Sequence, residues 1–272
     1  MVSDEALGVG ALEESASGAG VYVYGIVLAG ALEGRDPLVS PAIGGKGDRI
    51  RAVRAGDLAA LVSDSPEARY DVSRVNLLTH QRVLEEILAF TEVVPAQFGL
   101  VSASDERIGK QLLRERHDEL LAILAYIRGR VELGLKVFWK REIVFSEIVE
   151  GRDDIRAMRD EIAAGAGHFD QIRLGQMVEK AMADLRAGDA DEILAALEPL
   201  CVELKTNALL TDMMVLNAAF LVEKEREEEF DAAVNAIAER NGERLILKYA
   251  GPLPPFDFIK LSLDQLSSEG EG

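Results

Sequence analysis

The chain has 272 residues, of which 48% are hydrophobic and 29% are charged, a composition typical of a globular protein with about two domains. Its formal net charge of −18 argues against binding to nucleic acid or to an anionic membrane surface, because both need clustered Lys and Arg. Cys201 is the only cysteine, which excludes an intramolecular disulfide and paired-cysteine metal or redox motifs. No apolar run approaches the roughly 18–20 residues of a membrane span, and the first residues lack the basic region of a signal peptide. We therefore expect a cytoplasmic protein.

The first half of the chain predicts an N-terminal α+β domain over residues 21–129. Residues 1–20 are rich in Gly, Ala, Ser and Glu without lasting periodicity, so we expect a disordered leader there. In 21–28, apolar side chains occupy both alternating faces, as in a strand that is covered on both sides. The elements expected after it are a glycine-rich loop at 29–48, hairpin strands at 50–54 and 58–63, a helix at 75–89, an edge strand at 93–99, and a helix at 105–128 with Ser104 as its N-cap.

The second half predicts another α+β domain over residues 130–250. Its expected elements are a strand at 131–139, helical segments through 151–199, strands at 202–208 and 213–222, a helix at 230–241 and a last strand at 245–249. Within the helical stretch, Asp189 with Glu192 resembles a capping box that starts a new helix. This order is that of a split βαβ, ferredoxin-like fold. Its third strand lies inside the sheet, in agreement with the almost wholly apolar run at 213–222.

The segment Gly251–Phe258 follows the last predicted strand and contains three prolines and two phenylalanines. Proline fixes φ and removes a backbone donor, so the segment is predicted to be neither helix nor central strand. We expect it to leave the domain as an extended arm whose Phe rings pack against another surface. Residues 251–272 are therefore predicted to be a Pro/aromatic tail with a disordered end.

Three histidines are the obvious candidates for catalysis. His80 falls on an apolar helical stripe with Leu77, Leu84 and Ile87, and His117 lies on a similar stripe. Each could act as a general base, but a histidine in this setting is more often a core-edge residue with one hydrogen bond. His168 is expected in a loop or at a helix start. None has a second ligand at metal-binding spacing, so no metal or cofactor site is predicted.

The remaining motifs have plain structural explanations. Gly44–Asp48 looks like a phosphate loop, but Lys46 is followed by Gly instead of Ser or Thr, so a flexible turn is favoured. Cys201 is expected to be a small buried hydrophobe. The acidic run Glu223–Glu229 suits the first turn of a helix, and a docking face for a basic partner is the alternative. The sequence predicts no catalytic residue.

Several segments, in this order along the chain, resemble the GvpL/GvpF gas vesicle proteins over about residues 20–261. Three departures from the family pattern are Gln97 where Arg is common, Leu253 where Trp is common and Phe256 where Tyr is common. The matching segments are Val21–Val27, His80 with Val83 and Leu84, Val94–Gly99 (with Pro95, Phe98 and Gly99), Glu132–Val137, Asn217–Val222 (with Asn217 and Phe220), and the closing segment with Gly251, Pro252, Pro254, Pro255, Phe256 and Phe258.

The resemblance implies a two-domain α+β accessory protein of gas vesicle formation, with a ferredoxin-like C-terminal domain and a tail that packs back on the N-terminal domain. It implies a non-enzymatic role in the prokaryotic cytoplasm, in which the protein binds the hydrophobic shell protein or other accessory proteins, and neither nucleic acid nor membrane. Two alternatives stay open: a small-molecule-binding regulatory module on the ferredoxin-like domain, and an enzyme that uses His80 or His117.

Overall fold

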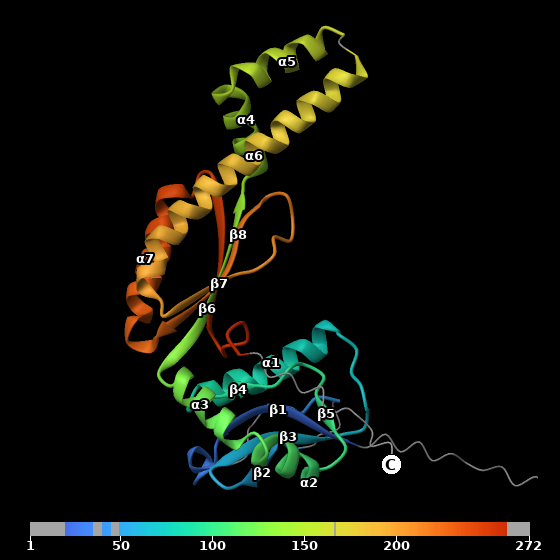
Figure 1. Ribbon diagram of the computed structural model, residues 1–272, viewed down its shortest axis with the longest axis vertical. Helices are drawn as coiled ribbons and strands as arrows, with labels where there is room; N and C mark the ends of the chain where they lie inside the picture. Colours follow the sequence, from blue (N-terminus) through green and yellow to red (C-terminus); the bar gives the residue numbers. More distant parts are fainter. Residues whose placement is uncertain (1–19, 35–39, 45–48, 166, 260–272) are drawn as a thin grey trace, which may run out of the picture. The chain divides into compact units, whose positions relative to one another are not determined.

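The structure, a computed structural model, describes residues 20–34, 40–44, 49–165 and 167–259 (Figure 1). The predicted leader, apart from Gly20, and the predicted end of the tail at 260–272 lie outside the described residues. The described chain divides into two compact units, the first formed by 20–83 and 96–117 and the second by 84–95 and 118–259. None of the described helices has the length and apolarity needed to cross a membrane.

The first unit is built on an antiparallel sheet in which β3 (Leu58–Ser65) pairs with both β1 (Gly20–Leu28) and β2 (Arg51–Ala55). The short strand β5 (Val101–Ser102) pairs with β1. β1 is buried over Val21–Val27, which confirms the strand covered on both faces. The predicted hairpin between β2 and β3 is also confirmed. Gly56 occupies its turn with φ +61°, a conformation that favours glycine.

Helices complete this part of the chain, together with η1 (Ala29–Leu32) and the two-residue strand β4 (Val94–Pro95). α1 (Arg74–Leu88) matches its prediction. The single helix predicted over 105–128 is wrong: the chain forms α2 (Asp105–Arg107), the π-helical segment η2 (Ile108–Arg114) and α3 (His117–Ile127). The wider π-helical turn accompanies full burial of the adjacent Leu112 and Leu113, which a regular helix would direct to different sides. Ser104 caps α2 as predicted, because its Oγ accepts the N–H of Arg107 at 3.2 Å.

The second unit contains an antiparallel sheet with strand order β7-β8-β6-β9. β8 is central and buried along nearly its whole length, as its apolar sequence predicted. The strands are β6 (Arg130–Trp139), β7 (Glu203–Thr206), β8 (Met214–Glu223) and β9 (Leu245–Leu253). The helices that pack on one face of this sheet are α6 (His168–Leu197) and α7 (Glu227–Asn241), joined to their neighbouring strands by η3 (Glu198–Leu200) and η4 (Lys224–Arg226).

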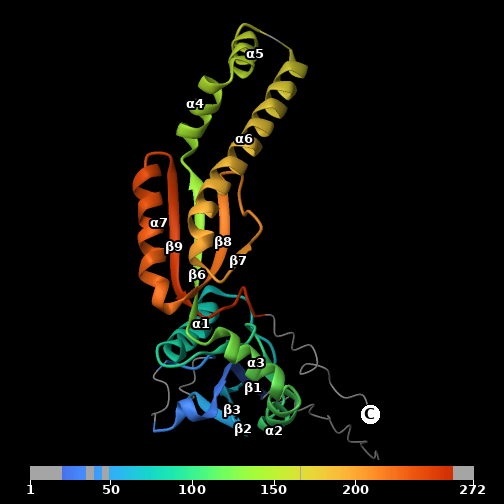
Figure 2. The same cartoon turned by 60° about the vertical axis from the view of Figure 1, so that its left-hand side comes forward.

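The helical stretch before β7 differs from its prediction. α4 (Arg141–Gly151), which the sequence did not indicate, follows β6 directly, and α5 (Asp153–Ala163) runs beside the first half of α6 (Figures 1 and 2). α6 is one continuous helix of 30 residues, so Asp189 is not the start of a new helix. Its carboxylate instead accepts the indole N–H of Trp139 at 2.6 Å and the guanidinium of Arg244 at 2.7 Å. These contacts from distant strands outweigh the local capping pattern.

Candidate functional site

A buried cluster of polar aromatic side chains lies in the first unit, between β1 and α1. The hydroxyl of Tyr22 bonds Nδ1 of His80 at 2.9 Å, and the ring of Tyr24 stacks on the His80 ring at 5.8 Å between centroids. The hydroxyl of Tyr24 also accepts the N–H of Ile43 at 2.8 Å and bonds Oγ of Ser63 at 3.0 Å. The cluster therefore fixes several chain segments to β1 through buried hydrogen bonds.

His80 has the properties of a core residue. Only 3% of His80 is exposed, and its Nε2 has no hydrogen-bond partner within normal distance and angle among the described residues. Burial lowers the pKa of His80 to about 4, while the backbone carbonyl of Ala96 acts in the opposite direction. The ring is therefore neutral at pH 7. The predicted placement of His80 on the inner face of its helix, with one hydrogen bond, is confirmed.

The signature residues Phe98 and Gly99 pack against this cluster. The Phe98 ring meets the His80 ring edge-on at 5.8 Å, and the N–H of Gly99 donates to the Tyr22 hydroxyl at 3.1 Å. Gly99 has φ +85°, which explains why glycine occupies that turn. Gln97, where the family often has Arg, is exposed. Pro95 is buried in β4, so these signature positions support the fold and leave Gln97 available to solvent.

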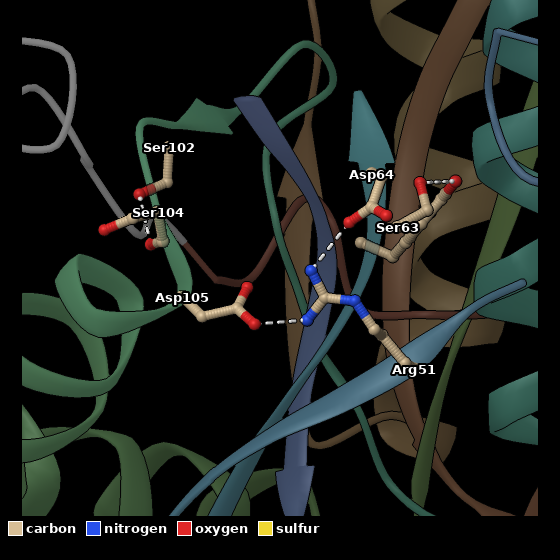
Figure 3. A network of polar contacts seen from close by, with 7 residues as sticks. Arg51, Ser63, Asp64, Ser102, Ser104 and Asp105 are labelled. Atoms are coloured by element: carbon tan, nitrogen blue, oxygen red, sulfur yellow. Dashed lines mark hydrogen bonds and ion pairs between the residues drawn. The ribbon is translucent and has the colours of Figure 1, made fainter. Parts of the chain in front are cut away.

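A network of polar contacts joins three elements of the first unit at its surface (Figure 3). Arg51 on β2 donates from Nη2 to Asp64 on β3 at 2.8 Å and from Nη1 to Asp105 at the start of α2 at 2.6 Å. Both carboxylates are largely exposed, so solvent screens the pairs and each contributes little to stability. The network positions α2 next to the hairpin.

The closing segment corrects the prediction of an extended arm. Gly251, Pro252 and Leu253 belong to β9, and Leu253 pairs with Glu132 after a bulge in the register. A proline is tolerated here because β9 is an edge strand. The Gly251-Pro252 peptide is cis. After β9 the chain turns instead of extending, since the N–H of Phe256 donates to the carbonyl of Pro254 at 2.7 Å.

The turn is held by side chains of β6, of β7 and of the residue that follows β7. The N–H of Asp257 donates to Oε2 of Glu132 at 2.8 Å, and the carbonyl of Asp257 accepts Nζ of Lys205 at 3.0 Å. The amide of Asn207 donates to the Asp257 carboxylate at 3.1 Å, and Nζ of Lys205 lies 5.0 Å from the centre of the Phe258 ring. We call these residues, Glu132, Lys205, Asn207, Asp257 and Phe258, the tail clamp.

Glu132 is the unusual group in the tail clamp because only 3% of it is exposed. Its pKa is raised to about 8: burial is the main cause and the neighbouring Asp257 carboxylate adds to it, while the Asp257 N–H and Lys205 act in the opposite direction. A carboxyl group with this pKa is mostly protonated at pH 7 and can donate a hydrogen bond. Sequence reasoning missed Glu132, although its alternation with Val131 and Leu133 placed it opposite the helix-covered face.

Two further signature residues stabilise the second unit next to the tail clamp. The side-chain amide of Asn217 on β8 donates to the carbonyl of Ala208 at 2.8 Å. The backbone carbonyl of Asn217 accepts the backbone N–H of Asn207 at 2.7 Å. Phe220 is fully buried and packs against Phe230 at 5.0 Å between ring centres. Asn217 therefore fixes the loop that carries Asn207 toward Asp257.

The other residues considered from sequence have structural positions. His117 and His168 are the first residues of α3 and α6. Cys201 is half-buried rather than buried, and its thiol donates to the carbonyl of Glu198 at 3.3 Å. The acidic run supplies the first turn of α7, as predicted, and Lys46 lies outside the described residues. No group of three metal-binding side chains occurs in the part of the chain that the structure describes.

Comparison with known proteins gives a consistent match. The family model described as gas vesicle synthesis protein GvpL/GvpF matches residues 20–260. Gas vesicle protein F of Streptomyces sp. (strain CB03234) is 33% identical over 244 residues, which cover 88% of this chain and 99% of that protein. Gas vesicle protein F of Dolichospermum flosaquae is 30% identical over 204 residues, 74% of this chain and 83% of that protein.

A solved structure agrees with these matches. The crystal structure of gas vesicle protein GvpF from Anabaena sp. PCC7120 superposes with a TM-score of 0.76 at 27% sequence identity, covering 90% of this chain and 99% of that one. The matched region includes both compact units, the aromatic cluster and the tail clamp. The chain belongs to the GvpL/GvpF family of gas vesicle synthesis proteins, which implies involvement in gas vesicle formation.

Proposed function

We propose that this protein is a non-enzymatic accessory protein of gas vesicle formation, which binds the hydrophobic shell protein, other accessory proteins, or both during assembly. The observation that carries the proposal is the family match over residues 20–260, which includes described residues of both compact units. The expected location is the gas vesicle in the cytoplasm of a prokaryotic cell.

Physical chemistry makes a binding role reasonable. A shell subunit that exposes a large apolar surface aggregates unless another protein covers that surface. A partner with a formal net charge of −18 would keep the resulting complex dispersed, because like-charged particles repel one another. The chain would then serve as an acidic carrier that releases its cargo during assembly.

The non-enzymatic part of the proposal draws support from the Glu132 carboxyl and the His80 imidazole, whose pKa values both differ strongly from the ordinary ones. Glu132 holds the tail through the N–H of Asp257, and His80 holds Tyr22 inside the first unit. Perturbed pKa values often mark catalytic sites, but buried structural networks produce them as well. Here the hydrogen bonds that surround both groups join chain segments to one another.

We further propose that the second unit is a ferredoxin-like domain. Its elements follow the order strand, helices, strand, strand, helix, strand, and its sheet has the order β7-β8-β6-β9 expected for that fold. The suggestion that the tail packs on the N-terminal domain stays a prediction. Asp257 and Phe258 contact Glu132, Lys205 and Asn207, which belong to the second unit.

Co-expression with the gas vesicle proteins of the same organism tests the binding role. The chain, tagged and purified, should retain the shell protein or at least one accessory protein, and deletion of its gene should abolish or reduce gas vesicles. Rescue with a chain that ends after Ala250 should fail, because that chain lacks the end of β9 and the Asp257 and Phe258 of the tail clamp. A chain that ends after Ile259 keeps all described tail contacts and is the matched control. Normal vesicles in the deletion strain would refute the proposal.

A further inference from the structure

A groove of about 430 Å³ lies in the second unit between α4 and α6, away from the tail clamp. Figure 2 shows α4 beyond one end of the sheet, and α6 running along the sheet and past that end. Each helix contributes residues at helical spacing, so the groove runs along two facing surfaces. The residues that matter for its chemistry are Glu147, Ile148 and Gly151 of α4 and Leu185, Gly188 and Asp189 of α6.

The two glycines leave the floor of the groove open. A Cβ added at Gly151 or at Gly188 would meet no heavy atom within 4 Å, and neither residue has a positive φ. Neither close packing nor backbone conformation therefore requires glycine here, although glycine weakens a helix. Beside them, Ile148 is buried and Leu185 half-buried. The groove thus offers an apolar floor with room for aliphatic side chains.

The charge along the wall of the groove is unbalanced. The guanidinium of Arg244 donates to Glu147 at 2.6 Å and to Asp189 at 2.7 Å, so one cation serves two carboxylates. Asp189 is well covered, whereas 43% of the Glu147 side chain is exposed. These three groups together carry one net negative charge. The other charged residues that line the groove, Arg152 and Asp184, each pair with an opposite charge, Asp154 and Lys180, so they leave this balance unchanged. The Glu147 carboxylate has capacity for a second donor. An occupant that brings a cation would complete the arrangement.

We propose that the groove between α4 and α6 is the docking site for a basic segment of a protein partner. An aliphatic side chain of that segment lies over Gly151 and Gly188, and a neighbouring Lys or Arg pairs with Glu147. The charge of the whole chain favours the approach of such a segment. This inference rests on the proposed function, because it names the surface by which the protein holds one of its partners.

The test compares two identical substitutions on one helix. Gly188→Leu fills the groove, while Gly175→Leu places the same side chain on an exposed part of α6 outside it. A Cβ at either position meets no atom within 4 Å, so both variants should fold and gain helix propensity equally. Thermal unfolding of the two variants checks this before binding is measured.

Binding is measured by pull-down of each purified gas vesicle protein of the same organism on the immobilised full chain. At least one partner should be retained about tenfold less by Gly188→Leu than by Gly175→Leu. Glu147→Gln should weaken binding of the same partner, and the binding that remains should depend less on salt concentration than that of the unaltered chain. Peptides of 15 residues tiled along that partner then locate the segment by fluorescence anisotropy. The peptide bound through the groove should contain Lys or Arg next to an aliphatic residue.

The outcomes separate the two proposals. If the unaltered chain retains partners but Gly188→Leu and Gly175→Leu retain them equally, the groove is not a docking site and the proposed function stands. An acidic or uncharged peptide as the tightest binder would also overturn the basic-segment assignment. If the unaltered chain retains none of the gas vesicle proteins, the proposed function fails. The docking proposal then fails too, because it rests on that function.

Discussion

Replacement of Glu132 with Gln tests the electrostatics of the tail clamp directly. Glutamine has nearly the same shape as glutamate and keeps a carbonyl oxygen that can accept the N–H of Asp257. In the unaltered protein this N–H donates to Oε2 of Glu132 at 2.8 Å. It differs in that it never ionises. Burial raises the pKa of Glu132 from an ordinary value of 4.5 to about 8, so the substitution removes a group whose ionisation the folded protein disfavours.

The sign of the effect follows from proton binding. Below pH 4.5 the carboxyl group is protonated in both folded and unfolded chains, and its contribution to stability is fully present. Between pH 4.5 and about 8 the unfolded chain releases the proton while the folded chain keeps it, so the free energy of unfolding falls as the pH rises. The full shift of the Glu132 pKa, from 4.5 to about 8, corresponds to a loss of about 5 kcal/mol in the free energy of unfolding. This value is an upper bound because the tail can detach locally before the unit unfolds.

The assay is thermal unfolding from pH 4 to pH 9, followed by the fluorescence of Trp139. This residue is the only Trp in the chain and is buried in the second unit, so it reports on the unit that holds Glu132. Relative to the unaltered protein, Glu132→Gln should gain stability steadily as the pH rises. Glu179→Gln removes one exposed negative charge from α6 and serves as the control. Parallel curves for Glu132→Gln and the unaltered protein across this range would refute the reasoning.

Three further predictions concern buried contacts. The pKa of His80 is lowered from 6.5 to about 4, so the contribution of His80 to stability should be constant above pH 6.5 and fall by about 3 kcal/mol as the pH drops to 4; His80→Phe should lack this part of the pH dependence in urea unfolding at pH 7 and 4. Gly251→Ala should cost about 1–3 kcal/mol in the urea midpoint, because Gly251 has φ +151° and an added Cβ would lie 2.5 Å from Leu133. Trp139→Phe should cost about 1–2 kcal/mol in thermal unfolding measured by circular dichroism, since the buried Asp189 loses an indole donor. Unchanged stability of Gly251→Ala or Trp139→Phe would refute the corresponding prediction, as would a fall between pH 7 and pH 4 that is equally large in His80→Phe and in the unaltered protein.

Strand positions could be predicted because period-two alternation is a local signal that burial reinforces. The strand predicted at 131–139 appears as β6, and the apolar run at 213–222 appears as the central strand β8. Hydrophobic residues on both faces are required only in the middle of a covered sheet, so the composition of β8 also fixed its place. Helix boundaries were less predictable. The hydrogen bonds of the Asp189 carboxylate go to Trp139 and Arg244, not to its neighbours in sequence, so the local pattern wrongly predicted a helix start at this residue.

The candidate site was harder to predict because its members meet only through the tertiary fold. The alternation of β6 shows which face Glu132 occupies, but no local signal shows what covers that face. The covering group is the Asp257 turn, 125 residues later in the chain. The sequence marked the segment that contains Asp257 by its prolines, and marked Asn217 as the one polar residue of an apolar strand, without showing that Asn207 links them.

The prolines of the closing segment acquire a physical explanation from this geometry. The sequence argument held that such a segment cannot be a central strand, and the structure agrees, since it uses the segment as the end of the edge strand β9. The bulge between Ala250 and Leu253 gives β9 one more residue than β6 and bends the edge strand. Pro254 and Pro255 are buried and end the ladder, and the turn that follows brings the Asp257 N–H onto Glu132. In this chain the closing segment therefore covers the carboxyl group of Glu132, and the pH profile of Glu132→Gln measures how well it does so.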